Sequence, residues 1–373
     1  MVKSARSEVA MVFAMRICSA SFLMMVVGVH HHDAQELEVF LGDPPFQVIQ
    51  EIHEEAERAK RDSPLAVDAR NRSAVVSFFN SEYIAPLNVA MGWTGNVATC
   101  DAGTTSQGYI DATFQIINFY RGMAGMADVT NATSYNASAQ EAALIMSANG
   151  ALSHSPPSFW TCHTTSGATA AGESNLALGN AGPRAMIAYI RDSGNDNYFV
   201  GHRRWILYPR RNQFGTGSVG ETTTAANALN VFTSTVPRPA TPTKVAWPPE
   251  GYVPYQVVYP RWSLSINTGS SVSFASADVT LTEGSTPMGL TVVSRTNNGY
   301  GDNTIVWEPS DFNFTPGTQD RTLTVTVSNI MVGGSPQTEV YNVVVIDPAV
   351  VSDTIFSDGF ETGDLSWWSQ TVP

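Results

Sequence analysis

The segment VGHRRWILYP, residues 200–209, lies at the centre of this 373-residue chain and indicates how its middle third folds. Apolar and aromatic residues recur through the stretch 198–208, a pattern that predicts a β-strand. A strand points alternate side chains to opposite faces, which gives His202, Arg204 and Ile206 on one face and Arg203, Trp205 and Leu207 on the other. Because Trp205 and Leu207 suit a core, we expect His202 and Arg204 to face a cleft and its ligand. An exposed arginine pair is otherwise an ordinary solvated feature.

Three helices are predicted before this segment. Residues 111–123 carry apolar side chains on one helical stripe and end at Ala124-Gly125. A second helix begins near Ser138, which has Glu141 three residues later as in a capping box, and ends at Asn149-Gly150. A third begins at Pro183, a residue suited to a first helical turn, and breaks at residues 192–194.

Four short motifs occur in order along these elements. They are Asn118-Phe119-Tyr120-Arg121, LSHSP around His154, Gly172-Glu173-Ser174-Asn175-Leu176, and Gly201-His202 leading to Trp205. Their order and the intervening helices resemble the CAP superfamily (cysteine-rich secretory, antigen 5, pathogenesis-related 1) over about residues 105–235. The stretches INFYRGMAG, LIMSANGALSHSPPSFWTC and VGHRRWILYP resemble the bacterial branch of that family in particular.

The resemblance implies a cleft lined by two histidines and two acidic residues. The matching positions are His154, Glu173, Asp192 and His202. The chain departs from the family pattern in three places. Ser174 stands where asparagine usually follows the glutamate directly, Asp192 is an aspartate where glutamate is common, and Arg203-Arg204 replaces Tyr-Thr. The last change alters the shape and charge of the cleft near Arg204.

Two chemical interpretations of the histidine pair stay open. His154 and His202 each have a nitrogen that can bind a divalent metal such as Zn²⁺, with the carboxylates completing the shell or orienting the rings. Alternatively, the four groups hydrogen-bond one another across the cleft, and the carboxylates fix the histidine tautomers. We interpret His53 and His163 as bystanders.

Composition and charge exclude one class of partner. The chain has 20 basic and 33 acidic residues, a formal net charge of −13, which repels the phosphate backbone of a nucleic acid. Only 14% of residues are charged, while there are 29 glycines and 21 prolines, which favours loop-rich and β-rich architecture.

The N-terminus predicts export. Basic residues precede an apolar run, residues 17–29, and Ala34 offers a cleavage site, so residues 1–34 are interpreted as a signal peptide. The apolar run is too short for a stable membrane anchor, so we expect no transmembrane anchor after cleavage. The protein is then extracellular, or located in the periplasm or outer envelope. Cleavage removes Cys18 and leaves Cys100 and Cys162 as the only pair, which predicts a disulfide.

The fold class expected is an α+β CAP α-β-α sandwich domain followed by an all-β Ig-like sandwich domain. Residues 35–100 form a polar lead-in segment that is partly helical, with an amphipathic helix over 46–61. The CAP domain covers residues 101–235, and prolines between 236 and 248 separate it from a β-sandwich over 245–348. Residues 353–373 are an acidic, aromatic C-terminal tail without the spacing of a calcium-binding EF-hand loop.

Three functions follow from these observations. The resemblance implies a non-catalytic extracellular protein that binds a small apolar ligand, a peptide or a cell-envelope component. The second is a peptide or ester hydrolase with a histidine base or a zinc-activated water, although the chain has neither an HExxH pair nor a GxSxG elbow. In the third, the β-sandwich binds cell-surface polysaccharide or protein through Trp262, Tyr300 and Trp307, unless these aromatic residues are buried in its core.

Overall fold

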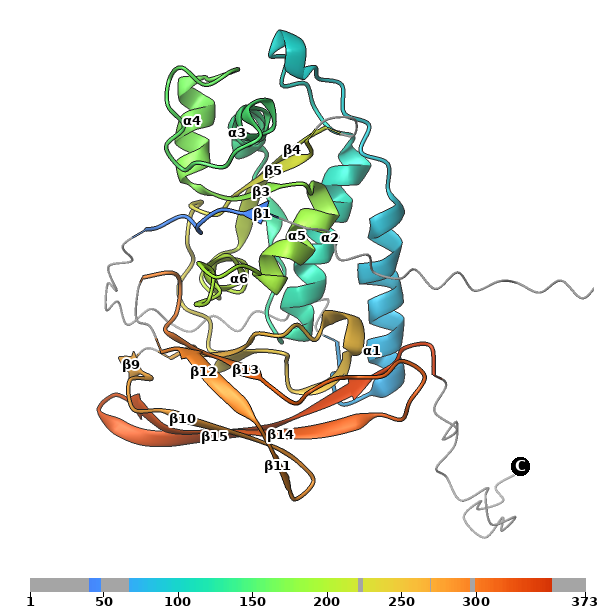
Figure 1. Ribbon diagram of the computed structural model, residues 1–373, viewed down its shortest axis with the longest axis vertical. Coiled ribbons are helices and arrows are strands. Elements are labelled where there is room, and N and C mark those ends of the chain that lie inside the picture. The colour runs from blue at the N-terminus through green and yellow to red at the C-terminus, as the bar shows by residue number, and fades with distance from the viewer. Residues whose placement is uncertain (1–39, 48–66, 221–223, 269, 296–298, 351–373) are drawn as a thin grey trace, which may run out of the picture. The chain divides into compact units, whose positions relative to one another are not determined.

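A five-stranded sheet with helices on both faces forms the first part of the structure (Figure 1). This computed structural model describes residues 40–47, 67–220, 224–268, 270–295 and 299–350, all within the unit Glu38–Pro373. The strands lie in the order β1 (Phe40–Leu41), β3 (Ser174–Leu178), β5 (Ala226–Asn230), β4 (Gln213–Val219) and β2 (Thr130–Asn131). The predicted signal peptide at 1–34, most of the predicted helix at 46–61 and the tail at 353–373 lie outside the described residues.

Successive residues of the central strands point into two different cores, one on each face of the sheet. Leu176 and Ala228 pack with α3 (Asn136–Asn149) and α4 (Thr165–Gly172). Their neighbours Ala177 and Leu229 pack with α2 (Gln107–Met123) and α5 (Gly182–Arg191). This alternation is what a sheet buried on both sides requires. The predicted α-β-α layering is therefore present.

The predicted helices are confirmed, with corrected starting points. Helix α2 starts at Gln107, four residues earlier than predicted, because the Ser106 hydroxyl accepts from the Tyr109 backbone N–H at 3.2 Å. Helix α3 starts at Asn136, so the predicted capping box is wrong. The Ser138 hydroxyl instead donates to the Tyr135 carbonyl at 3.1 Å, and Glu141 accepts from the Thr164 hydroxyl.

The predicted strand at 198–208 is wrong, because this segment contains the helix α6 (Gly201–Ile206). The Arg204 and Leu207 backbone N–H groups donate to carbonyls four residues earlier, as in a helix. Every residue from 201 to 206 is buried, so there is no solvent-facing side on which the inferred alternation could appear. The strand prediction placed the two arginines at the surface or in an open cleft, whereas both are buried in the protein.

Residues beyond 243 are mostly β and form two sheets. One has the order β12 (Leu290–Ser294), β13 (Thr304–Pro309), β8 (Trp262–Ile266) and β6 (Lys244–Trp247). The other has the order β11 (Thr286–Met288), β10 (Asp278–Glu283), β14 (Arg321–Val332), β15 (Ser335–Ile346) and β7 (Gly251–Pro254), and β9 (Val272–Ser273) pairs with β14. Strand β7 runs parallel to β15. An all-β region is therefore present, while its Ig-like arrangement stays a prediction.

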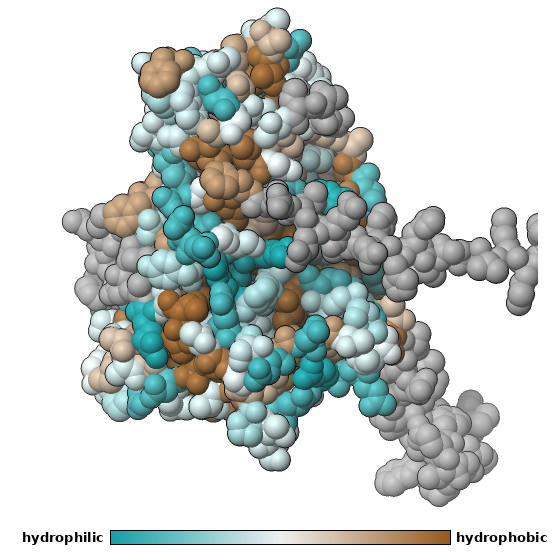
Figure 2. Space-filling model, in the orientation of Figure 1, coloured by the Kyte–Doolittle hydropathy of each residue, from teal (hydrophilic) through white to brown (hydrophobic). Residues whose placement is uncertain are grey.

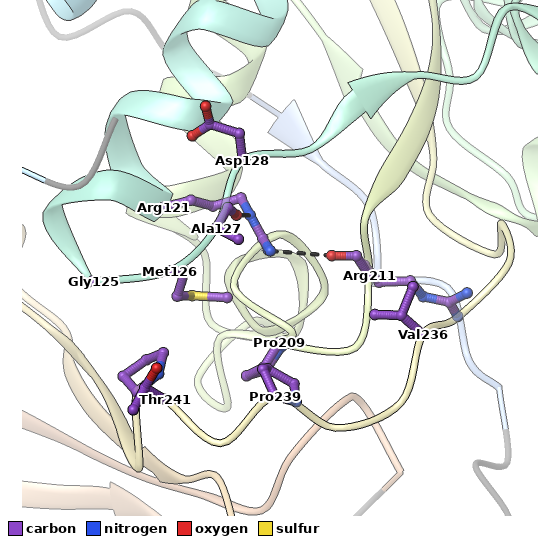
Figure 3. A pocket seen from close by; sticks show the side chains of 11 residues that line it. Arg121, Gly125, Met126, Ala127, Asp128, Pro209, Arg211, Val236, Pro239 and Thr241 are labelled. Atoms are coloured by element: carbon purple, nitrogen blue, oxygen red, sulfur yellow. Dashed lines mark hydrogen bonds between the residues drawn. The ribbon is translucent and has the colours of Figure 1, made fainter. Parts of the chain in front are cut away.

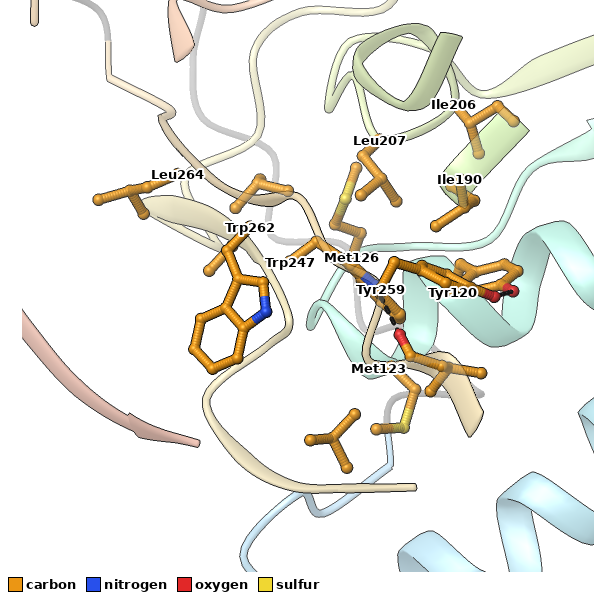
Figure 4. Packing of buried hydrophobic residues seen from close by; sticks show 14 of the residues in the cluster. Tyr120, Met123, Met126, Ile190, Ile206, Leu207, Trp247, Tyr259, Trp262 and Leu264 are labelled. Atoms are coloured by element: carbon orange, nitrogen blue, oxygen red, sulfur yellow. Dashed lines mark hydrogen bonds between the residues drawn. The ribbon is translucent and has the colours of Figure 1, made fainter. Parts of the chain in front are cut away.

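One continuous core joins the two regions (Figure 4). The Tyr120 hydroxyl on α2 lies 2.7 Å from the Tyr259 hydroxyl in the β region, and the Tyr120 ring lies 5.0 Å from the Trp247 ring. Helix α1 (Arg72–Phe79) adds Val75 and Phe79 to the same core, although it lies in the predicted lead-in segment. Two further helical turns, Asn80–Ile84 and Ala85–Asn88, continue it.

Candidate functional site

The predicted site residues Asp192 and His202 form a buried pair. Asp192 ends α5 with a left-handed backbone conformation (φ 54°), and His202 lies in the first turn of α6. The His202 ring Nδ1 lies 2.8 Å from Asp192 Oδ1, and the other carboxylate oxygen accepts from the Arg203 backbone N–H at 3.2 Å. Both side chains are 0% exposed. The break between α5 and α6 therefore brings together two of the four predicted cleft residues.

The carboxylate fixes the tautomer of His202. Because Asp192 accepts a hydrogen bond from Nδ1, that nitrogen carries the proton and Nε2 is left with a lone pair. Nε2 is buried and has no hydrogen-bond partner among the described residues. The His202 ring stacks on Tyr189, with ring centroids 5.6 Å apart, and its backbone carbonyl accepts from the Asn175 side chain at 3.1 Å. The pair has the orientation of a general base but no open path to solvent.

Sequence reasoning missed the polar residues around this pair. The buried Tyr189 hydroxyl lies 2.9–3.2 Å from the Asn175 carbonyl and from the Asn227 backbone and side-chain oxygens, and its single hydrogen bonds to one of these acceptors. Asn175 belongs to the glycine–glutamate motif, and Tyr189 lies three residues before Asp192 on α5. These residues could have been suspected from the sequence because they are polar and lie within otherwise apolar segments.

His154, the third predicted residue, lies between two backbone carbonyls. Its Nδ1 is 2.6 Å from the Ala171 carbonyl oxygen, and its Nε2 is within hydrogen-bond distance of the Asp43 carbonyl oxygen. A neutral imidazole donates from only one nitrogen, so which of the two carbonyl oxygens accepts depends on the tautomer. The ring is partly exposed, in contrast to His202.

Glu173 follows a residue that contacts the His154 segment. A Cβ atom at the preceding Gly172 would lie 3.2 Å from the His154 carbonyl oxygen, so the two segments are in close contact. The Glu173 carboxylate accepts from the Asn230 side chain at 3.0 Å, and its backbone carbonyl accepts from Val231. Glu173 is half-buried. The four predicted residues thus divide into a sealed pair, Asp192 and His202, and a partly exposed pair, His154 and Glu173.

Arg204 does not face an open cleft. Its guanidinium donates to the Asp302 carbonyl at 3.0 Å and lies 6.0 Å from the Tyr300 ring centre. Its neighbour Arg203 donates to the Arg261 carbonyl and the Ser263 hydroxyl. Burial lowers the pKa of both guanidinium groups to about 10, partly offset for Arg203 by the charge of Asp192. Both arginines therefore connect α6 to the β region.

The predicted zinc ligands do not form a zinc site. Within the described ranges, no three His, Cys, Asp or Glu side chains gather as a metal would require. Both ring nitrogens of His154 face carbonyl oxygens, and His202 Nδ1 faces Asp192. Because structural and catalytic zinc sites use at least three protein ligands, these residues do not fit the ion.

Two hollows lie elsewhere. One of about 40 Å³ lies beside Arg121, which donates to the Ile206, Tyr208 and Arg211 carbonyls (Figure 3). That volume holds only a few water molecules. Through these hydrogen bonds Arg121 joins the end of α2 to the segment that follows α6. The other, about 260 Å³, lies between Tyr255, Trp262 and Phe312 in the β region. On the face in Figure 2 hydrophobic and hydrophilic areas are interspersed.

The predicted disulfide is confirmed. Cys100 and Cys162 are bonded across a separation of 62 residues, with their Cα atoms 5.0 Å apart. The bond joins the turn before α2 to the loop that carries His154 toward α4. In addition, no helix in the described part of the chain is long and apolar enough to cross a membrane.

The sequence comparisons agree with this arrangement. The model of the CAP family, described as the cysteine-rich secretory protein family, matches residues 114–234. No curated protein matches the chain. The matched range contains four of the five strands of the first sheet, the helices α3 to α6, the disulfide residue Cys162 and all four predicted cleft residues. This protein therefore carries a CAP-superfamily domain.

Proposed function

We propose that this protein is a secreted CAP-domain protein that binds its ligand without chemical conversion at the surface formed by His154 and Glu173. The proposal rests on a difference in exposure between the two pairs of predicted site residues. The Asp192–His202 pair is 0% exposed, whereas His154 and Glu173 are partly exposed and belong to segments that touch at Gly172. A ligand that meets this surface would contact an imidazole and a carboxylate acceptor. The ligand classes consistent with it are a small apolar molecule, a peptide and a cell-envelope component.

Secretion is part of the proposal. It is supported by the basic and apolar pattern of residues 1–34 and by the Cys100–Cys162 disulfide, a bond that persists mainly in oxidising compartments. An extracellular, periplasmic or outer-envelope location is consistent with both. Detection of the mature N-terminus near residue 35 in culture medium or envelope fractions would test it.

Calorimetric titration of the full chain tests the binding proposal. The probes are a fatty acid, a sterol, a muramyl peptide and a set of extended peptides. We expect one class to bind, and His154→Ala or Glu173→Gln to weaken that binding about tenfold, which is about 1.4 kcal/mol. His163→Ala is the matched control and leaves affinity unchanged. Equal affinity in the parent and both site variants would overturn the proposal.

One observation favours hydrolysis as a second candidate. Asp192 holds His202 with a free Nε2 lone pair, the orientation of a general base in a nucleophile–histidine–acid triad. A conformational opening would have to expose it. Assay of the parent and His202→Ala on peptide and ester panels decides between the candidates, since turnover lost only in the variant supports hydrolysis.

The third candidate, sugar binding by the β region, receives no support from its predicted aromatic residues. Trp262 and Trp307 are buried, and Tyr300 packs against Phe46, Phe199 and Trp205. These side chains are therefore committed to packing.

A further inference from the structure

The segment Phe40–Gln47 lies along the edge of the CAP sheet beside the site. Its first two residues form β1, antiparallel to Leu178 and Ala177 of β3, and appear as the blue strand beside β3 in Figure 1. The segment belongs to the part of the chain that precedes the matched CAP range. Strand β3 would otherwise be the edge of the five-stranded sheet. An edge strand presents unpaired backbone groups, to which a further extended chain can pair.

Beyond β1, side chains of the CAP domain donate to this segment at every second residue. His154 Nε2 contacts the Asp43 carbonyl oxygen, and Trp205 Nε1 donates to the Pro45 carbonyl oxygen at 2.8 Å. Arg211 donates to the Gln47 side-chain oxygen at 2.9 Å. The three acceptors, two backbone carbonyls and one side-chain oxygen, are spaced two residues apart along the segment. The three donors therefore form a row that matches an extended peptide.

Most of this recognition is independent of side-chain identity. Two of the three donors meet carbonyl oxygens, which every residue has, and β1 pairs through its backbone. Backbone pairing supplies affinity in β-strand addition, while a few side-chain seats supply specificity. A row of this kind would accept an extended chain that is not covalently part of the domain.

Two side chains of the segment, Leu41 and Pro44, pack into specific places on the CAP domain, which we call seats. Leu41 is 8% exposed and packs into the core, whereas the adjacent Phe40 is 62% exposed. Pro44 lies against Gly201, where a Cβ atom would come within 2.3 Å of Pro44 Cγ. The Gly201 of the Gly-His motif therefore leaves space for a proline. An aliphatic residue three positions before a proline fits both seats.

We propose that this row is a docking groove for an extended peptide and that Phe40–Gln47 is its displaceable occupant in the intact chain. The inference rests on the proposed function, since His154 belongs to both, and it narrows the ligand to a peptide. A tethered occupant competes at millimolar effective concentration. A free peptide therefore binds weakly until the chain's own segment is displaced.

The test uses a fluorescently labelled peptide of residues 38–47, EVFLGDPPFQ, and the full chain. Leu41→Asp places a charge in the buried seat and weakens the occupant, while Phe40→Asp makes the same change at the exposed neighbour. We expect the Leu41→Asp chain to bind the peptide at least about tenfold more tightly than the parent or Phe40→Asp. A peptide carrying the same Leu41→Asp change should not bind.

A folded Leu41→Asp chain that binds the peptide no better than the parent would overturn the inference. Hydrogen exchange of the parent provides a readout that does not depend on a variant. We expect the amides of β1 to exchange at least about tenfold faster than those of β5, because a displaceable segment opens without global unfolding. Equal protection would show β1 to be an integral strand. Ligand binding that depends on His154 and Glu173 but not on the peptide would defeat only this inference.

Discussion

The Asp192 carboxylate is the acceptor on which the buried polar groups of the site depend. It accepts hydrogen bonds from the His202 ring and from the Arg203 backbone, and its charge favours the charged form of the Arg203 side chain. A buried donor that loses its acceptor has no water to replace it. The left-handed backbone at Asp192 suits aspartate or asparagine better than most residues.

Asp192→Asn is therefore expected to lower the free energy of unfolding by about 1–3 kcal/mol. Asparagine keeps the backbone conformation but replaces one acceptor oxygen by a donor, so one of the two donors loses its partner. Asp196→Asn, an exposed aspartate four residues later, is the matched control and should change stability by less than about 0.5 kcal/mol. Urea unfolding measures both. Equal stability of the two variants would contradict this account of the pair.

For single residues, the sequence predicts which side chains contact each other more readily than it predicts how buried they are. The position of Asp192 after α5 and the Gly-His motif were enough to propose that Asp192 and His202 share a site, and their side chains are 2.8 Å apart. Their burial depends on Tyr189 and Asn175, which come from other elements. No local pattern around residue 202 contains that information.

Helix α6 shows the same limitation at the scale of an element. Apolar residues at 205–207 fit a strand and a short buried helix equally well, because a segment packed on all sides has no polar face to reveal its period. The longer helices α2 and α5 were predictable because each has clear stop signals. Arg203 of α6 donates to acceptors in the β region that no local pattern reveals.

Arg203 connects α6 to the β region. We therefore expect even a substitution that keeps its charge to lower the stability of the protein. It donates to the Ile190 and Arg261 carbonyls and to the Ser263 hydroxyl at 2.6–3.0 Å. Lysine keeps the charge but not the planar fork of donors. Arg203→Lys should lower the unfolding free energy by about 1–3 kcal/mol, whereas Arg70→Lys, at an exposed position, should not. Denaturant midpoints that coincide would refute the connector role.

The disulfide constrains two loops, one before α2 and one between α3 and α4. It closes a 62-residue separation between Cys100 and Cys162. A loop of that length predicts a loss of about 2–4 kcal/mol when both cysteines become serine. Reduction of the parent should give the same midpoint as the double variant in calorimetry. A variant as stable as the oxidised parent would mean that native packing alone fixes these loops.

For the whole molecule, the shared core means that the CAP and β regions stabilise each other. The Tyr120–Tyr259 contact, the Trp247 ring and the Arg203 fork all cross between them. The predicted boundary near residues 236–245 was inferred from prolines, which mark a change of secondary structure but not the end of a core. Composition could not reveal that aromatic residues more than 100 positions apart pack together.

The buried tyrosines of this core give a test of its integrity at high pH. Burial raises the pKa of Tyr83, Tyr120, Tyr189 and Tyr259 above their usual value of about 10. Since the folded pKa exceeds the unfolded pKa, their contribution to stability is complete below about pH 10 and is lost as the pH rises further. Arg203 and Arg204, with pKa lowered to about 10, act in the opposite direction between about pH 10 and 12.5.

Tyrosinate absorbance separates the two effects, because only tyrosines contribute to it. We expect the four buried tyrosines to ionise only as circular dichroism reports unfolding, since a buried phenolate is strongly disfavoured. Tyr120→Phe should reduce the tyrosinate absorbance that appears with unfolding. If all tyrosines ionised while circular dichroism stayed native, the interior joining the two regions would be open to water, and the single core would have to be abandoned.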